Sequence, residues 1–174
     1  ALFGNEAMNV IDGGGQDTKV ITCKGRTVVE FFMNDKCSAG TGKFLEVMAN
    51  RLNISMEDLN SLAKEHTEEV KISSMCTVFA ESEVISLVGQ GIERANIAYG
   101  ILQSVAGKVV QMLGRLRDQS PEVYLTGGLC EAAYFQEILS EKIGKPIHSH
   151  KNARYAGALG AAVLAKEQVE KGRM

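Results

Sequence analysis

The chain of 174 residues has no tryptophan and two prolines, and its formal net charge is −2, because 19 basic residues stand against 21 acidic ones. This near balance excludes a generic electrostatic grip on nucleic acid. No apolar run approaches the ~18 residues of a membrane span, and the first residues lack the basic-then-apolar order of a signal peptide. These absences predict a cytoplasmic protein with one ordinary domain or at most two small lobes.

The four cysteines, at positions 23, 37, 76 and 130, include no C-x-x-C pair. Their spacing fits neither a disulfide framework nor a zinc ribbon. Any metal site would therefore have to be assembled from segments that lie far apart in the sequence. No Ser-His-Asp or Cys-His grouping follows from the spacing either, so hydrolysis through a covalent nucleophile has little support.

Glycine, in contrast, is abundant, with 18 residues or about a tenth of the chain against a usual ~7%. Apolar periodicity predicts three antiparallel strands at the start of the chain, then helices that alternate with two further strands. This order is typical of a mixed α/β sheet of the ribonuclease-H-like kind, which binds ligands at strand ends. The predicted strands cover residues 8–12, 19–23, 27–33, 123–126 and 146–150, and the predicted helices cover a segment after Gly42 and residues 55–64, 78–88, 93–117, 132–143 and 154–171.

The first connection between strands combines glycines with polar side chains. Consecutive glycines let bare backbone approach phosphate oxygens, to which amide N–H groups donate. Asp12 could hold magnesium directly or through water, and Gln16 could orient a water molecule. The alternative is an ordinary flexible hairpin tip, and the strand-to-strand setting excludes the Walker and dinucleotide fingerprints, which need a following helix. The candidate residues are Asp12, Gly13, Gly14, Gly15, Gln16, Asp17, Thr18 and Lys19.

A second glycine pair, Gly127 and Gly128, follows the short predicted strand that ends at Thr126. By itself this pair is either a nucleotide contact or a plain turn into a helix. If all the strands belong to one sheet, the two glycine sites face one cleft. That arrangement would favour a nucleotide as the ligand.

Two of the cysteines directly precede predicted helices. Cys37 lies within the polar, glycine-bearing residues 34–42, and Cys76 lies just ahead of the helix predicted at 78–88. A helix start presents free N–H groups and the positive end of the dipole, which stabilise a thiolate. Two thiolates do not complete a four-thiolate iron-sulfur site, but the twofold axis of a homodimer would supply two more. The alternative is a pair of ordinary buried cysteines, an interpretation that we keep for Cys23 and Cys130.

Five sequence strings occur here in the order known from one family. On these strings the chain resembles the activators, or ATPase components, of 2-hydroxyacyl-CoA dehydratases. This group includes the 2-hydroxyglutaryl-CoA dehydratase activators and is related to the ATPase subunits of benzoyl-CoA reductase. The resemblance covers essentially the whole chain, and the two cysteine motifs are its most specific part. The strings are DGGGQDTK at residues 12–19, NDKCSAGTG at 34–42, CTVFAESE at 76–83, TGG at 126–128 and GALGA at 157–161.

The resemblance implies an actin-like and sugar-kinase-like ATPase fold, a homodimer, and one 4Fe-4S cluster held between the subunits by Cys37 and Cys76. Each subunit would bind ATP or ADP with Mg²⁺, and nucleotide-driven movement of the helices after the cysteines would change the setting of the cluster. One electron would then pass at low potential from a ferredoxin or flavodoxin to a dehydratase or reductase partner. The resemblance thus implies an oxygen-sensitive, ATP-dependent electron donor of anaerobic metabolism.

Two departures from the family pattern bear on these expectations. Gly13 stands where the family has isoleucine, which we expect to loosen the strand end without removing a phosphate contact. The family's N-terminal lobe, with its own phosphate hairpin, has no counterpart here. Residues 1–174 are therefore expected to be the C-terminal nucleotide- and cluster-binding portion, which binds nucleotide weakly and hydrolyses none alone. Two alternatives stay open: an actin-like ATPase or sugar-kinase relative without a cluster, and a non-catalytic cluster-carrier or dimerisation module.

Overall fold

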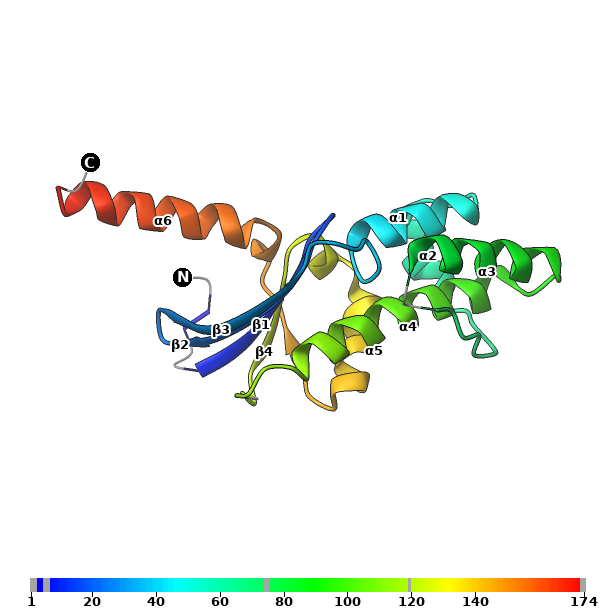
Figure 1. Cartoon of the computed structure of the whole chain (residues 1–174), viewed down its shortest axis with the longest axis horizontal. Coiled ribbons are helices and arrows are strands. Elements are labelled where there is room, and N and C mark those ends of the chain that lie inside the picture. Colours follow the sequence, from blue (N-terminus) through cyan, green and yellow to red (C-terminus); the bar gives the residue numbers. More distant parts are fainter. Residues whose placement is uncertain (1–2, 5–6, 74–75, 119, 173–174) are drawn as a thin grey trace.

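The computed structural model describes residues 3–4, 7–73, 76–118 and 120–172 (Figure 1). Within these residues, five strands form one sheet in the order β3-β2-β1-β4-β5. The strands are β1 (Ala7–Gly13), β2 (Thr18–Lys24), β3 (Thr27–Asn34), β4 (Val123–Thr126) and β5 (Ile147–His148). The helices are α1 (Gly42–Arg51), α2 (Met56–Ala63), α3 (Thr77–Gly89), α4 (Arg94–Leu113), α5 (Ala133–Ile143) and α6 (Ala156–Glu170), with 3₁₀ turns η1 (Gly128–Glu131) and η2 (Ala153–Tyr155).

Strand β1 is the centre of the sheet. It pairs antiparallel with β2 and parallel with β4, while β3 extends one side antiparallel and β5 the other side parallel. Asp12 and Thr126 are neighbours at the ends of the parallel strands β1 and β4. The carboxyl ends of these two strands therefore open onto the same edge of the sheet. This mixed sheet with flanking helices confirms the fold class predicted from the sequence.

Helix α4 forms the middle of the core. It buries 14 of its 20 residues and contacts β2, α1, α2, α3 and α5. The predicted packing of this long helix against the sheet is confirmed at β2, and the rest of these contacts are with helices. One position depends on glycine, because a Cβ added at Gly100 would lie 2.4 Å from the carbonyl oxygen of Val70. The chain between α2 and α3 consequently lies directly on the backbone of α4.

Local signals explain where other elements begin and end. Helix α2 begins at a capping box, in which Asp58 N–H donates to Ser55 Oγ and the Asp58 carboxylate accepts from the Ser55 N–H. The predicted strand at 146–150 is shorter than expected. Ser149 instead donates from its hydroxyl to the Leu125 carbonyl, and the His150 carbonyl accepts from Ala153 N–H in a turn. The polar side chain thus replaces a strand pairing there.

Helix α6 extends away from the other helices, on the side of the molecule where β2 and β3 lie (Figure 1). None of its residues is buried, although it carries apolar side chains such as Leu159 and Val163. Its predicted solvated, Lys- and Glu-rich end is confirmed as exposed, and Glu167 pairs there with Arg26 of the β2–β3 turn. None of the helices in the described residues combines the length and the hydropathy that a membrane span requires.

Candidate functional site

The connection between β1 and β2 is a tight hairpin. Gly13 and Thr18 are the last paired residues, and Gly14 N–H donates to the Asp17 carbonyl at 2.9 Å. The predicted hairpin with its run of glycines is therefore confirmed. Gly15 and Gln16 lie at its tip, where an added Cβ at Gly15 would meet no atom within 4 Å. The backbone of the tip is open to a ligand.

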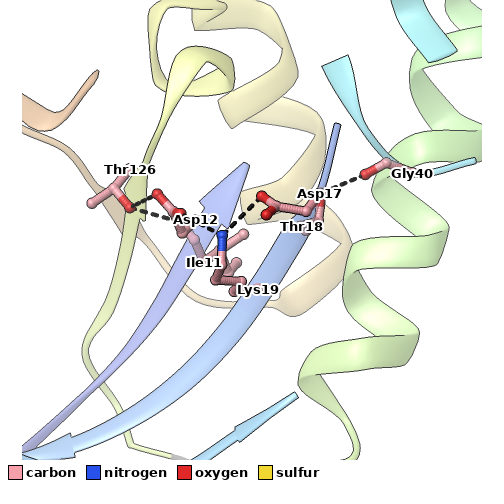
Figure 2. A network of polar contacts seen from close by, with 7 residues as sticks. All are labelled: Ile11, Asp12, Asp17, Thr18, Lys19, Gly40 and Thr126. Carbon is pink, nitrogen blue, oxygen red and sulfur yellow. Dashed lines mark hydrogen bonds and ion pairs between the residues drawn. The ribbon is translucent and has the colours of Figure 1, made fainter. Parts of the chain in front are cut away.

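Behind the tip, two carboxylates hold one ammonium group (Figure 2). Lys19 Nζ lies 2.8 Å from Asp17 Oδ1 and 3.6 Å from Asp12 Oδ2. Asp12 Oδ1 also accepts from the Thr126 hydroxyl at 2.7 Å. Burial by itself would lower the pKa of Lys19, but the neighbouring Asp17 and Asp12 outweigh it and raise that pKa above its usual value. Lys19 is therefore a cation at neutral pH, and the side chain of Asp12 keeps about 30% exposure.

The start of α1 is bonded directly to this hairpin. Gly42 N–H donates to the Gly14 carbonyl at 2.9 Å and Lys43 N–H to the Gly15 carbonyl at 2.7 Å. The Thr18 hydroxyl donates in turn to the Gly40 carbonyl at 2.7 Å (Figure 2). A Cβ at Gly42 would lie 3.2 Å from the Gly14 carbonyl oxygen, so a larger residue there would require a shift of a few tenths of an ångström.

The second glycine pair contacts the hairpin from the other side. Gly127 has φ +77° and ψ −175°, a conformation that glycine alone adopts readily, and an added Cβ would lie 2.5 Å from the Gly13 carbonyl oxygen. At Gly13 itself, an added Cβ would lie 2.8 Å from Leu129 Cδ1. The side chain of Leu129 thus packs directly against Gly13.

A cleft of about 470 Å³ opens at this edge of the sheet. It is lined from both glycine sites, by Gly14, Gly15 and Gln16 on one side and Gly128 on the other, so the predicted shared cleft is confirmed. The remaining candidates for the nucleotide site do not line the cleft. They support the lining residues through the hydrogen bonds, ion pairs and close contacts described above. They are Asp12, Gly13, Asp17, Thr18, Lys19 and Gly127.

Part of the cleft wall consists of residues that the sequence patterns did not predict. The missed residues come from α1, the start of α2, η1 and η2, and several are charged. Arg154 Nη1 lies 2.8 Å from Glu131 Oε2, and Lys43 Nζ lies 3.1 Å from Glu46 Oε2. The sequence offered a signal for two of them at most, because Gly42 ends the string NDKCSAGTG and Lys43 directly follows it. The missed lining residues are Gly42, Lys43, Glu46, Met56, Leu129, Glu131 and Arg154.

A larger hollow of about 770 Å³ lies along α5 and the turn before β5. Gln136, Glu137 and Lys145 are among its lining residues, and none of the predicted site residues is. We place the candidate site at the strand edge because glycine backbone and a partly exposed carboxylate converge there.

The two cysteines ahead of helices lie on neighbouring segments. Cys37 precedes α1 and Cys76 is the N-cap of α3, and both are half-buried. A hydroxyl pair joins the segments, with Ser38 Oγ 2.7 Å from Thr77 Oγ1. Neither helix has an acidic residue in its first turn. The positive end of each helix dipole, which lies near a cysteine, is therefore not offset by a carboxylate in that turn.

The other two cysteines differ in their surroundings. Cys23 lies on β2 and Cys130 in η1, and burial raises the pKa of both thiols. At Cys130 a hydrogen bond with Ser149 only partly opposes this effect. Both thiols are therefore protonated near neutral pH, as in ordinary cysteines that act as small hydrophobic residues. In the described parts of the chain, no group of three or more His, Cys, Asp or Glu side chains could hold a metal ion.

Comparison with known proteins decides the family. The sequence model of the BadF/BadG/BcrA/BcrD ATPase family matches residues 1–165. The chain belongs to this family. The resemblance inferred from the sequence strings is thereby confirmed.

Three members of the BadF/BadG/BcrA/BcrD ATPase family illustrate the similarity. The (R)-2-hydroxyglutaryl-CoA dehydratase activating ATPase of Acidaminococcus fermentans is 46% identical over 93% of this chain and 62% of its own length. The activator of the 2-hydroxyisocaproyl-CoA dehydratase from Clostridium difficile, solved with bound ADPNP, has a TM-score of 0.87 and 38% identity, over 97% of this chain and 63% of that one. A benzoyl-CoA reductase component of Thauera aromatica is 34% identical over 95% of this chain and 61% of its own length.

A more distant structure shows the fold alone. MreB 5 of Spiroplasma citri has a TM-score of 0.57 at 15% identity, over 96% of this chain and 56% of that one. With the activators, it places the chain in the actin-like ATPase fold. The chain spans about three fifths of the length of the family members that it matches.

Proposed function

We propose that this chain is the nucleotide- and cluster-binding part of an ATP-dependent one-electron donor. The donor would reductively activate a 2-hydroxyacyl-CoA dehydratase or a related reductase. Family membership supports this proposal, because the similar proteins are named as dehydratase activators and as a component of benzoyl-CoA reductase. The observation that carries it is the continuous bonding from the glycine cleft to the two cysteine segments.

The cleft at the strand edge is the proposed site for ATP or ADP. Gly14, Gly15 and Gly128 offer bare backbone to phosphate oxygens, and Gly13 and Gly127 allow the two segments to touch. Asp12 would hold Mg²⁺, directly or through water, since its carboxyl is partly exposed beside Thr126. Gln16 lines the cleft at the tip and would orient a water molecule. Asp17, Thr18 and Lys19 would keep the hairpin in shape from behind.

Cys37 and Cys76 are the proposed ligands of a 4Fe-4S cluster shared by a homodimer. The residues fit half of such a site, because two thiols lie on segments that are bonded to each other at the starts of two helices. A second copy related by a twofold axis would complete the four thiolates. When bound, the cluster supplies one-electron redox chemistry, with a ferredoxin or flavodoxin as the source of the electron and the dehydratase or reductase as its acceptor.

The nucleotide site and the cysteine segments are proposed to be coupled through residues 40–43. Thr18 bonds the Gly40 carbonyl, and Gly42 N–H bonds the hairpin at Gly14. A nucleotide that binds one arrangement of the hairpin more tightly than another would favour that arrangement. Because the hairpin is bonded to the loop that carries Cys37, the same nucleotide would also favour one position of that loop. In this arrangement, this chain's residues transmit the nucleotide state to the thiols.

Anaerobic iron and sulfide analysis tests the proposed function. We expect roughly four irons per dimer in the reconstituted protein and none after Cys37→Ser or Cys76→Ser, because each change removes two of four ligands from a shared site. Cys23→Ser, on β2, is the matched control and should keep the iron. Iron at the unmodified stoichiometry in either ligand variant would contradict the assignment. A protein that binds ADP but no iron would favour an actin-like ATPase without a cluster, and iron binding with no response to nucleotide would favour a carrier module.

A further inference from the structure

One side-chain contact links the two cysteine segments at the residues that directly follow the cysteines. Ser38 Oγ lies 2.7 Å from Thr77 Oγ1, and either hydroxyl can donate. The partners are 39 residues apart in the sequence and belong to the loop before α1 and to the first residue of α3. The bond therefore joins two segments that are too far apart in the sequence for local interactions to place them side by side.

Each of the two segments also has hydrogen bonds of its own that do not involve the other segment. Asn34 Nδ2 donates to the carbonyls of Cys37 and Ala39, at 2.9 and 2.8 Å, and the Thr41 hydroxyl donates to the Ser38 carbonyl at 2.6 Å. These bonds shape residues 37–41 but do not reach α3. On the other side, the Cys76 carbonyl accepts the first bond of α3, from Ala80 N–H at 3.0 Å.

Farther along, α1 and α3 meet at a second point. Arg51, the last residue of α1, forms an ion pair with Glu81 in the second turn of α3. This pair fixes the spacing of the two helices at the end of α1, away from its cysteine. The hydroxyl pair is the corresponding polar contact at the cysteine end.

We propose that Ser38 and Thr77 are positioning residues, which hold Cys37 and Cys76 at the spacing that a shared cluster requires. The proposal rests on the proposed function, since it concerns the same two thiols. Loss of one ordinary hydrogen bond between the two segments corresponds to about a fivefold change in an equilibrium. In a hydroxyl pair one proton makes the mutual bond, so the accepting hydroxyl keeps its own proton for a further acceptor.

Two variants remove the bond with little change in volume, and one keeps it. Ser38→Ala and Thr77→Val delete one hydroxyl each, while Thr77→Ser retains the hydroxyl. Ser82→Ala is the matched control, because the Ser82 hydroxyl donates to the Val78 carbonyl within α3 and not to the loop before α1. We expect the half-life of the reconstituted cluster against an iron chelator to fall about fivefold in Ser38→Ala and Thr77→Val. Thr77→Ser and Ser82→Ala should stay near the unmodified half-life.

A second readout needs no cluster. Iodoacetamide modification of Cys37 and Cys76 in the iron-free protein, followed by mass spectrometry, should be about fivefold faster in Ser38→Ala and Thr77→Val, which is the factor for loss of one ordinary hydrogen bond. Unchanged modification rates in both variants would overturn the positioning role. If the unmodified protein bound no iron but the thiols still responded, the cluster assignment would fail while the positioning of the thiols stood.

Discussion

The nucleotide edge and the cysteine segments are built by different kinds of contact, although residues 40–43 join them. At the edge, backbone meets backbone directly, as at Gly42 against Gly14 and Gly127 against Gly13. The cysteine segments meet instead through the side-chain hydroxyls of Ser38 and Thr77. Close backbone contacts resist separation of the two segments that they join, whereas one hydroxyl bond contributes only about 1 kcal/mol net and can break and re-form. The molecule therefore has a rigid edge beside an adjustable pair of thiol-bearing segments.

The largest effect is expected at the rigid edge, from Gly127→Ala. The conformation at Gly127 is essentially restricted to glycine, and an added Cβ would lie 2.5 Å from a carbonyl oxygen. We expect a loss of about 3 kcal/mol in the free energy of unfolding, measured by urea denaturation. Gly128→Ala is the adjacent control, because a Cβ there meets no atom within 4 Å. Equal losses of unfolding free energy in Gly127→Ala and Gly128→Ala would contradict the contrast between the two regions, because the edge would then not depend on close backbone contact.

A smaller effect is expected where the two regions join, from Gly42→Ala. The added Cβ would lie 3.2 Å from the Gly14 carbonyl oxygen, so α1 must shift by a few tenths of an ångström. Overpacking of this kind costs about 1 kcal/mol of stability. We also expect weaker ADP binding by calorimetric titration, because the shift moves the hairpin tip. Gly107→Ala in α4, with open space around it, should leave ADP affinity unchanged and raise stability slightly.

The smallest effect is expected from the ion pairs of Lys19 behind the hairpin. It is measured as the pH dependence of the free energy of unfolding. The folded-state pKa of Lys19 lies above its unfolded value of about 10.5, so its contribution to stability is fully present below that pH and is lost as pH rises through the folded pKa. Because the pair is partly exposed, we expect about half a kcal/mol. Unfolding free energies compared at about pH 9 and pH 11.5 should fall more for the unmodified protein than for Lys19→Met. An equal fall of unfolding free energy in both proteins would show that the ion pairs of Lys19 do not stabilise the edge.

Local signals account for most of the elements. Ser55 and Asp58 marked the start of α2, and the spacing of apolar residues marked α4, since both signals act within a few residues of chain. The strand predicted at 146–150 was too long because Ser149 uses its hydroxyl where a strand would use its backbone. The lining residues Met56, Glu131 and Arg154 carried no signal at all, as each reaches the cleft from a different element.

The amino-acid order alone determined the glycine hairpin, the glycine pair after β4 and the two cysteine segments, because the conformations of glycine and the chemistry of thiols are properties of single residues. Only the tertiary structure decided that the two glycine sites share one cleft, that Leu129 packs beside Gly13, and that Ser38 meets Thr77. These contacts join residues 39 to more than 110 positions apart, and the packing of α1, α3 and the sheet around α4 sets them rather than any local pattern.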